Sequence, residues 1–132
     1  MSQQDALHKL RIIAADIKLA HSVFALPFAI LGAFLAASAQ ETGISWGRFS
    51  LQLGLIVLAM VFARTAAMLA NRILDAGLDA GNPRTSGRAI PSGRLSRRDG
   101  IVAWIIAFCL FLVVCALFGL FFANWWPLWL GI

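Results

Sequence analysis

Residues 49–79 read FSLQLGLIVLAMVFARTAAMLANRILDAGLD. The stretch carries no charge until Arg64 and is long enough to cross the hydrocarbon core of a bilayer as a helix. Three polar residues, Asn71, Asp75 and Asp79, then recur every four residues. At 3.6 residues per turn, side chains with this spacing share one helix face. The stretch therefore predicts a membrane helix that ends in a polar ladder, formed by Asn71, Asp75 and Asp79.

The composition of the whole chain is that of a membrane protein. Of its 132 residues, 61% are hydrophobic and only 13% are charged, whereas about one quarter of the residues in soluble domains are charged. The net charge is +5, but the basic residues flank apolar segments rather than cover a polar face, so no nucleic-acid partner is expected. We expect one domain over residues 1–132, an all-α integral membrane helical bundle in contact with the lipid bilayer.

The apolar segments predict three complete transmembrane helices, at about residues 22–40, 49–74 and 101–122. An amphipathic helix over residues 4–19 precedes them and is expected to lie on the membrane surface. Its apolar stripe is formed by Leu7, Leu10, Ala14 and Ile17. After the third span, an interface belt and a turn are marked by Asn124, Trp125, Trp126 and Pro127. The apolar residues that follow are expected to start a fourth span.

Basic residues also predict the orientation. Lys and Arg are concentrated before the first span and in the loop at residues 75–99, whereas residues 40–48 hold one acid and one base. By the positive-inside rule, the N-terminus and the 75–99 loop face the cytoplasm. We expect the bacterial inner (plasma) membrane as the location, with the polar ladder open to the cytoplasmic side.

The polar ladder carries oxygen ligands. Asp75 and Asp79 lie about 6 Å apart along a helix axis, and Asn71 adds an amide oxygen. Magnesium prefers oxygen ligands and usually takes one or two carboxylates together with substrate phosphates. Because many arginines follow in the 75–99 loop, these residues suggest a magnesium–diphosphate site, in which positive charge stabilises a departing diphosphate.

Each of these residues also has a simpler interpretation. The two aspartates could form a solvated helix end paired with Arg72. Arg64 could extend its long side chain outward to the membrane interface. The loop arginines could serve only to set the topology. A small non-catalytic membrane subunit that needs a partner, or half of an ion relay, is therefore the alternative to an enzyme.

The motifs resemble those of a known family. NRILDAGLD at residues 71–79 resembles NDxxDxxxD, the first aspartate-rich motif of the UbiA superfamily of intramembrane prenyltransferases. RAIPSGRLS at residues 88–96 is similar to the RPxPSGxxS segment of that family. HSVFALPF at residues 21–28 resembles the opening of the first helix in the 4-hydroxybenzoate polyprenyltransferase branch. Arg64 falls where the family has an arginine one heptad before the motif asparagine.

The resemblance implies a Mg²⁺-dependent aromatic polyprenyltransferase. Such enzymes move a polyprenyl group from its diphosphate to an aromatic acid such as 4-hydroxybenzoate, in ubiquinone or menaquinone biosynthesis. It implies that Asp75 and Asp79 are catalytic and that they bind the metal together with Asn71. The residues that it assigns to the substrates are Arg64 near the ring acid and Arg84 and Arg88 at the diphosphate. Arg72, although it departs from the motif, could itself face the diphosphate.

Two departures from the family pattern qualify this expectation. Arg72 stands where the motif has its first aspartate, and the following NPRT at residues 82–85 resembles the menaquinone-route branch, so the acceptor stays open between 4-hydroxybenzoate and a naphthoate. The family also has a second aspartate-rich motif in further C-terminal helices, whereas no acid follows Asp99 here. We expect the N-terminal part of such an enzyme, inactive unless C-terminal helices or a partner chain complete it.

Overall fold

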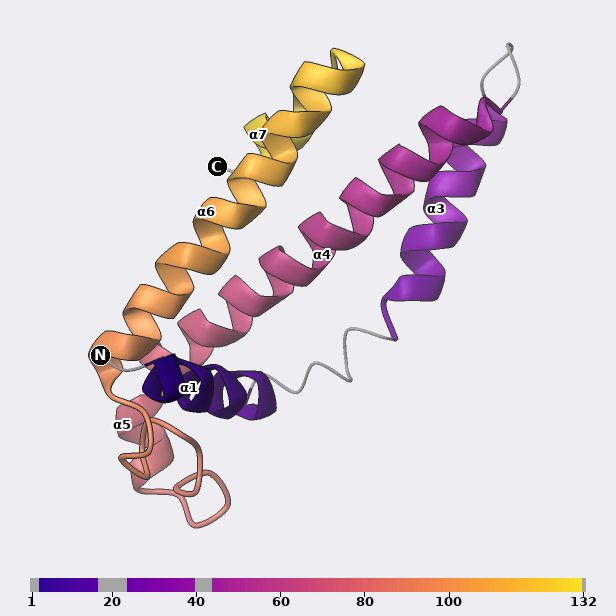
Figure 1. The fold of residues 1–132 in the computed structure, drawn as a ribbon. Coiled ribbons are helices and arrows are strands. Elements are labelled where there is room, and N and C mark those ends of the chain that lie inside the picture. Colours follow the sequence, from indigo (N-terminus) through magenta and orange to yellow (C-terminus); the bar gives the residue numbers. More distant parts are fainter. Residues whose placement is uncertain (1–2, 17–23, 40–43, 132) are drawn as a thin grey trace. The chain divides into compact units, whose positions relative to one another are not determined.

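The computed structural model describes residues 3–16, 24–39 and 44–131 (Figure 1). Every regular element in these ranges is a helix, so the all-α prediction is confirmed. The helices are α1 (Gln3–Asp16), α3 (Leu26–Ser38), α4 (Trp46–Leu74), α5 (Ala76–Ala80), α6 (Arg97–Phe122) and α7 (Trp126–Gly131).

Two helices, α4 and α6, are long and apolar enough to cross a membrane. They contain 29 and 26 residues. Only 17% and 22% of the residues in their most apolar windows are buried, so these helices present apolar side chains outward rather than form the interior of a soluble protein. They coincide with the second and third predicted spans.

The first predicted span, at about residues 22–40, is seen as the shorter helix α3. Its 13 residues extend over about 20 Å, less than the ~30 Å hydrocarbon core. Pro27 lies in the first turn of α3, where no backbone N–H is needed, so it starts the helix rather than kinks it. His21 and the first residues of the predicted span lie outside the described residues, and a third complete span stays a prediction.

The contacts divide the chain into two compact units. One comprises residues 1–19 and 64–107, and the other comprises residues 20–63 and 108–132. The long helices α4 and α6 each contribute to both.

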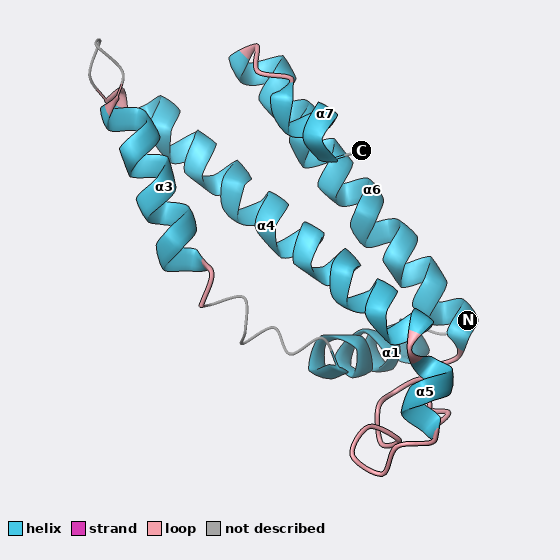
Figure 2. Cartoon of the chain, turned by 180° about the vertical axis from the view of Figure 1, so that it is seen from behind, coloured by secondary structure: helices cyan, strands magenta, loops and turns pink. Residues whose placement is uncertain are grey.

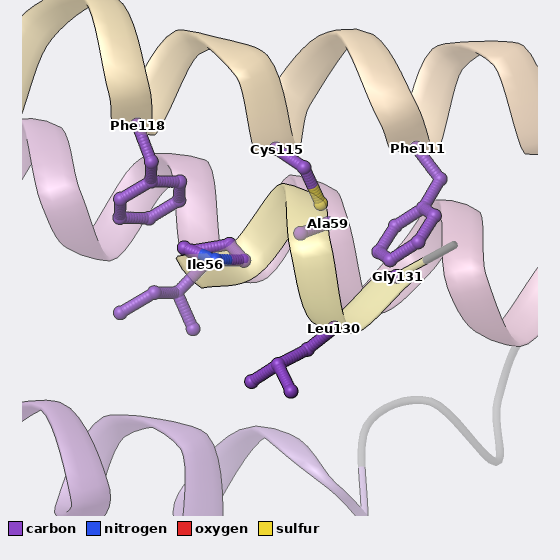
Figure 3. Close-up of a pocket in the computed structure, with 8 residues that line it drawn as sticks. Ile56, Ala59, Phe111, Cys115, Phe118, Leu130 and Gly131 are labelled. Atoms are coloured by element: carbon purple, nitrogen blue, oxygen red, sulfur yellow. The ribbon is translucent and has the colours of Figure 1, made fainter. Parts of the chain in front are cut away.

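Aromatic and aliphatic side chains hold the second unit together. The rings of Phe34 and Phe49 lie 4.7 Å apart, and Leu55 packs with Val114 and Phe118 in a buried cluster. An apolar pocket of about 410 Å³ lies beside this cluster. Figure 3 shows its lining, which comes from α4 (Ile56, Ala59), α6 (Phe111, Cys115, Phe118) and α7 (Pro127, Leu130, Gly131).

The helix α7 follows a reversal of the chain after α6. Ala123 adopts a φ of 55°, and Asn124 accepts a hydrogen bond from the backbone N–H of Trp126 at 3.2 Å. The turn predicted near Pro127 is thus present. Because α7 has six residues, its continuation as a fourth span stays a prediction.

The first unit contains α1, the end of α4, α5, the loop at residues 81–96 and the start of α6. Figure 2 shows the turns of this loop between α5 and α6. Ala89 and Leu95 are its buried apolar anchors, and the backbone N–H of Leu95 donates to the carbonyl of Ala89 at 2.9 Å. The loop is therefore folded onto itself by turns and hydrogen bonds.

The amphipathic helix predicted at residues 4–19 is present as α1, with residues 17–19 outside the described part of the chain. Leu7 and Leu10 on the predicted apolar stripe are 56% and 60% exposed, whereas Lys9 and Ile13 are half-buried. An exposed leucine face suits the predicted position on a membrane surface.

Candidate functional site

The polar ladder lies at the junction of α4 and α5. The helix α4 ends at Leu74, and Asp75, with ψ near −3°, joins it to α5. Helical hydrogen bonds continue across the junction, because the N–H of Asp75 donates to the carbonyl of Asn71 at 2.9 Å and the N–H of Asp79 donates to that of Asp75 at 2.8 Å. The three residues thus keep the predicted helical spacing, but their side chains lie in different environments. Asn71 and Asp75 are exposed, and Asp79 is buried.

A turn after α5 brings the loop back toward Asp79. The side-chain oxygen of Asn82 accepts the backbone N–H of Arg84 at 3.0 Å, an arrangement that favours a turn and that Pro83 reinforces by fixing its own φ. The hydroxyl of Thr85 donates to the backbone carbonyl of Asp79 at 3.2 Å. A second turn follows, in which the N–H of Arg88 donates to the carbonyl of Thr85 at 2.9 Å. These successive turns place Arg88 beside Asp79.

Asp79 and Arg88 form the closest charged pair of the site. The Nη1 group of Arg88 donates to both carboxylate oxygens of Asp79, at 2.8 and 2.7 Å. The Asp79 side chain is 9% exposed and that of Arg88 is 31% exposed. The pair provides the buried carboxylate with two short hydrogen bonds.

The environment of Asp79 favours its charged form. The hydrogen bonds from Arg88 hold the pKa of the Asp79 carboxyl below its ordinary value, although burial acts in the opposite direction. The positive charge of Arg72 also lowers this pKa, by a smaller amount. Asp79 is therefore held as a charged carboxylate by the neighbouring arginines.

The other predicted site residues do not take part in this ion pair. Asn71, Asp75 and Arg84 are exposed, and within the described ranges no side-chain ion pair joins them to Asp79 or Arg88. Their side chains are open to a ligand from outside. The structure thus brings together two of the predicted site residues directly, with Arg72 close enough to act electrostatically.

Arg64 lies within α4, in the same unit as this loop. Its Nε atom is buried and has no hydrogen-bond partner among the described residues. A buried donor without a partner costs about 1–3 kcal/mol, and more when the group is charged. Such a group calls for a physical explanation, and an anionic ligand would provide one.

The oxygen atoms of Asn71, Asp75 and Asp79 are the possible ligands for magnesium. Within residues 3–16, 24–39 and 44–131 there is no cluster of three or more His, Cys, Asp or Glu side chains that could hold a metal ion by itself. Asn71 and Asp75 present exposed oxygens, and magnesium is satisfied by one or two carboxylates with water and phosphate oxygens. The residues therefore fit a site shared with a phosphate ligand, in which Asp79 takes part only if Arg88 releases it.

The last arginine of the predicted loop motif has a structural task. Arg94 donates to the carbonyl of Gly87 at 2.7 Å and to the hydroxyl of Ser92 at 3.2 Å. Between them, Gly93 has a φ of +74°, a conformation that glycine adopts without strain. Arg94 and Gly93 thus fix the shape of the loop that carries Arg88.

A network at the start of α6 was not among the predicted site residues. Ser96 and Asp99 bond reciprocally there, and Lys9 of α1 pairs with Asp99. The pattern Ser-x-x-Asp before an apolar run is a recognisable helix start, so the Ser96–Asp99 part had a signal in the sequence. The link to Lys9, from a distant part of the chain, had none.

Comparison with known proteins identifies the family. Residues 25–132 match the UbiA prenyltransferase family. No curated protein and no solved structure matches the chain. The match includes both long helices, the polar ladder and the loop with Arg88. The chain therefore belongs to the UbiA prenyltransferase family, whose members are integral membrane proteins that transfer prenyl groups.

Proposed function

We propose that this protein transfers a polyprenyl group from its diphosphate to an aromatic acid, such as 4-hydroxybenzoate or a naphthoate, in ubiquinone or menaquinone biosynthesis. Family membership over most of the chain supports prenyl transfer. The observation that carries the finer proposal is the ion pair between Asp79 of α5 and Arg88 of the following loop, one helical turn after the exposed Asp75. Opposite charges concentrated at the end of an apolar helix suit a diphosphate and its counter-ion.

The reaction divides between bond breaking and bond making. The bond between the first prenyl carbon and the diphosphate oxygen breaks, and its electron pair leaves with the diphosphate. A ring carbon of the acceptor then forms a bond to the prenyl carbon and releases its proton to water. Arg72, Arg84 and Arg88 would bind the diphosphate and stabilise the charge that develops as it leaves.

The proposed metal ligands are Asn71, Asp75 and Asp79. Magnesium, when bound, supplies positive charge that neutralises the diphosphate. Asn71 and Asp75 would contribute their exposed oxygens. Asp79 would join them when Arg88 turns from the Asp79 carboxylate to the diphosphate, an exchange that keeps both charged groups paired.

Arg64 is the proposed contact of the aromatic acid. Its buried Nε lacks a partner among the residues that the structure describes. A guanidinium presents several donors in a planar fork that matches a carboxylate. The carboxylate of the ring substrate would therefore satisfy Arg64 and orient the ring.

From the distribution of basic residues, we place the Arg88 loop on the cytoplasmic side of a bacterial inner membrane.

The test is the binding of a prenyl diphosphate by the full chain in lipid nanodiscs. We expect saturable binding of farnesyl diphosphate that requires Mg²⁺ and is lost with EDTA. Asp75→Asn should weaken it strongly, because a carboxylate near the metal is replaced by a neutral amide of equal size. Binding that is absent, or that ignores both Mg²⁺ and the Asp75 substitution, would refute the proposed function.

A further inference from the structure

An ion pair joins the N-terminal helix to the start of α6. The Nζ of Lys9 lies 2.9 Å from each carboxylate oxygen of Asp99. The two side chains are 37% and 33% exposed, and ninety residues separate them in the chain. Both belong to the same compact unit, so the contact ties α1 to the unit that carries the candidate site.

Asp99 is also part of the helix start. Its backbone N–H donates to the Ser96 hydroxyl at 3.0 Å, and this hydroxyl donates to the Asp99 carboxylate at 2.8 Å. The Ser96 hydroxyl thus caps the first turn of α6, and the Asp99 carboxylate orients this hydroxyl. Because Lys9 binds the same carboxylate, the three groups form one network in which each bond orients the others.

The first turn of α6 in turn supports the loop with Arg88. A Cβ atom at Gly100 would lie 3.1 Å from the Cδ1 of Ile90 and 3.5 Å from the Cγ1 of Ile73. The backbone of α6 therefore packs directly on Ile90, two residues after Arg88, and on Ile73 near the end of α4. A displacement of this turn would move the residues that carry the Asp79–Arg88 pair.

We infer that Lys9 is a positioning residue. Through Asp99 it holds the first turn of α6 against the loop, and in this way it keeps Arg88 in place to bind the diphosphate of the prenyl donor. The identity of the ligand rests on the proposed function, whereas the ordering of the loop by Lys9 does not.

The test compares two charge reversals on α1 in the full chain in nanodiscs. Lys9→Glu opposes Asp99, while Arg11→Glu makes the same change of charge at an exposed position of the same helix. Hydrogen exchange is measured for the backbone amides of residues 82–95 and of the first turn of α6. Lys9→Glu should speed this exchange by about two- to fivefold, the range that a partly exposed ion pair supports. Arg11→Glu should leave it unchanged, and Lys9→Arg should retain protection.

The same variants are then tested with farnesyl diphosphate and Mg²⁺. Lys9→Glu should raise the Kd by about two- to fivefold, while Arg11→Glu and Lys9→Arg should not. Equal rates of hydrogen exchange in the Lys9→Glu and Arg11→Glu proteins would overturn the inference that Lys9 orders the loop. Faster exchange with an unchanged Kd would overturn the link to the diphosphate. If the unmodified protein binds no farnesyl diphosphate but Lys9→Glu still speeds exchange, the proposed function fails and the ordering role of Lys9 stands.

Discussion

Arg88 donates from a single nitrogen to both carboxylate oxygens of Asp79, at 2.8 and 2.7 Å. The family resemblance implies different ligands for these residues, the metal for Asp79 and the diphosphate for Arg88. In the structure they bind each other, which neutralises both at the site where the two ligands are proposed to meet. Ligand binding would then exchange partners among charged groups rather than bring an isolated charge into an apolar region.

Removal of the arginine should destabilise the loop. Arg88→Ala leaves the Asp79 carboxylate buried without its strongest partner, and such a group loses its compensation for desolvation. We expect the Tm of the protein in detergent to fall by a few degrees, as measured by circular dichroism. Arg84→Ala is the matched control, because the Arg84 side chain is exposed. Equal decreases in the two variants would contradict a stabilising role for the pair.

The pair should also give the stability a specific pH dependence. The pKa of Asp79 in the folded protein is lowered, chiefly by Arg88. The ionised carboxylate therefore contributes to the free energy of unfolding at pH values above the pKa of an unfolded aspartate, about 3.9. This contribution is lost as the pH falls below that value and through the folded pKa. Thermal unfolding of Asp79→Asn should therefore depend less on pH below about 4 than that of the unmodified protein. If the Tm of Asp79→Asn fell with acidification as much as that of the unmodified protein, Asp79 would not contribute to the pH dependence of stability.

The exposed carboxylate of Asp75 should be needed for turnover. In the complete, active enzyme, Asp75→Ala should lower prenyl transfer by ~10²-fold or more, comparable to the loss of one preorganised charge-stabilising group. Asp79→Ala should have a similar effect if that carboxylate joins the metal. Asp75→Glu keeps the charge and should retain more activity than Asp75→Ala. Near-normal rates in both alanine variants, measured with radiolabelled donor, would exclude the proposed metal role.

In the complete, active enzyme, Arg64 should affect the binding of the two substrates differently. Arg64→Ala removes the proposed partner of the ring carboxylate, so the KM for the aromatic acid should rise more than the KM for the prenyl diphosphate. Arg64→Lys keeps the charge but loses the planar fork, and should give an intermediate KM for the acid. Equal increases for both substrates in steady-state assays would argue against this placement.

The shape of the loop should depend on Gly93. Its φ of +74° is strained for any residue with a Cβ atom, and the strain amounts to about 1–2 kcal/mol. Gly93→Ala should therefore lower the free energy of unfolding by about this amount. Gly87→Ala is the control from the same loop, since a Cβ atom there meets nothing within 4 Å and no positive φ is involved. Chemical denaturation of the two variants in the same detergent distinguishes them.

Much of the fold could be predicted because it depends on local sequence. Uninterrupted apolar residues identified α4 and α6, and apolar residues at helical spacing identified α1. Helix ends were less certain: α6 begins at Arg97 rather than near residue 101, because Ser96 and Asp99 cap it before the apolar run starts. The four-residue spacing of Asn71, Asp75 and Asp79 was also predicted and is kept by the backbone.

The ion-pair partners of the charged side chains could not be predicted from the sequence. Helical periodicity and the length of an apolar segment depend on residues close together in the sequence, so both can be recognised along the chain. They identified the aspartates and arginines as candidate site residues. Which of these meet depends on how the chain turns at Asn82 and returns at Ser96, and on where α1 packs. The pairs Asp79–Arg88 and Lys9–Asp99 arise only when those segments fold together, because an ion pair depends on distance in space and not on separation along the chain.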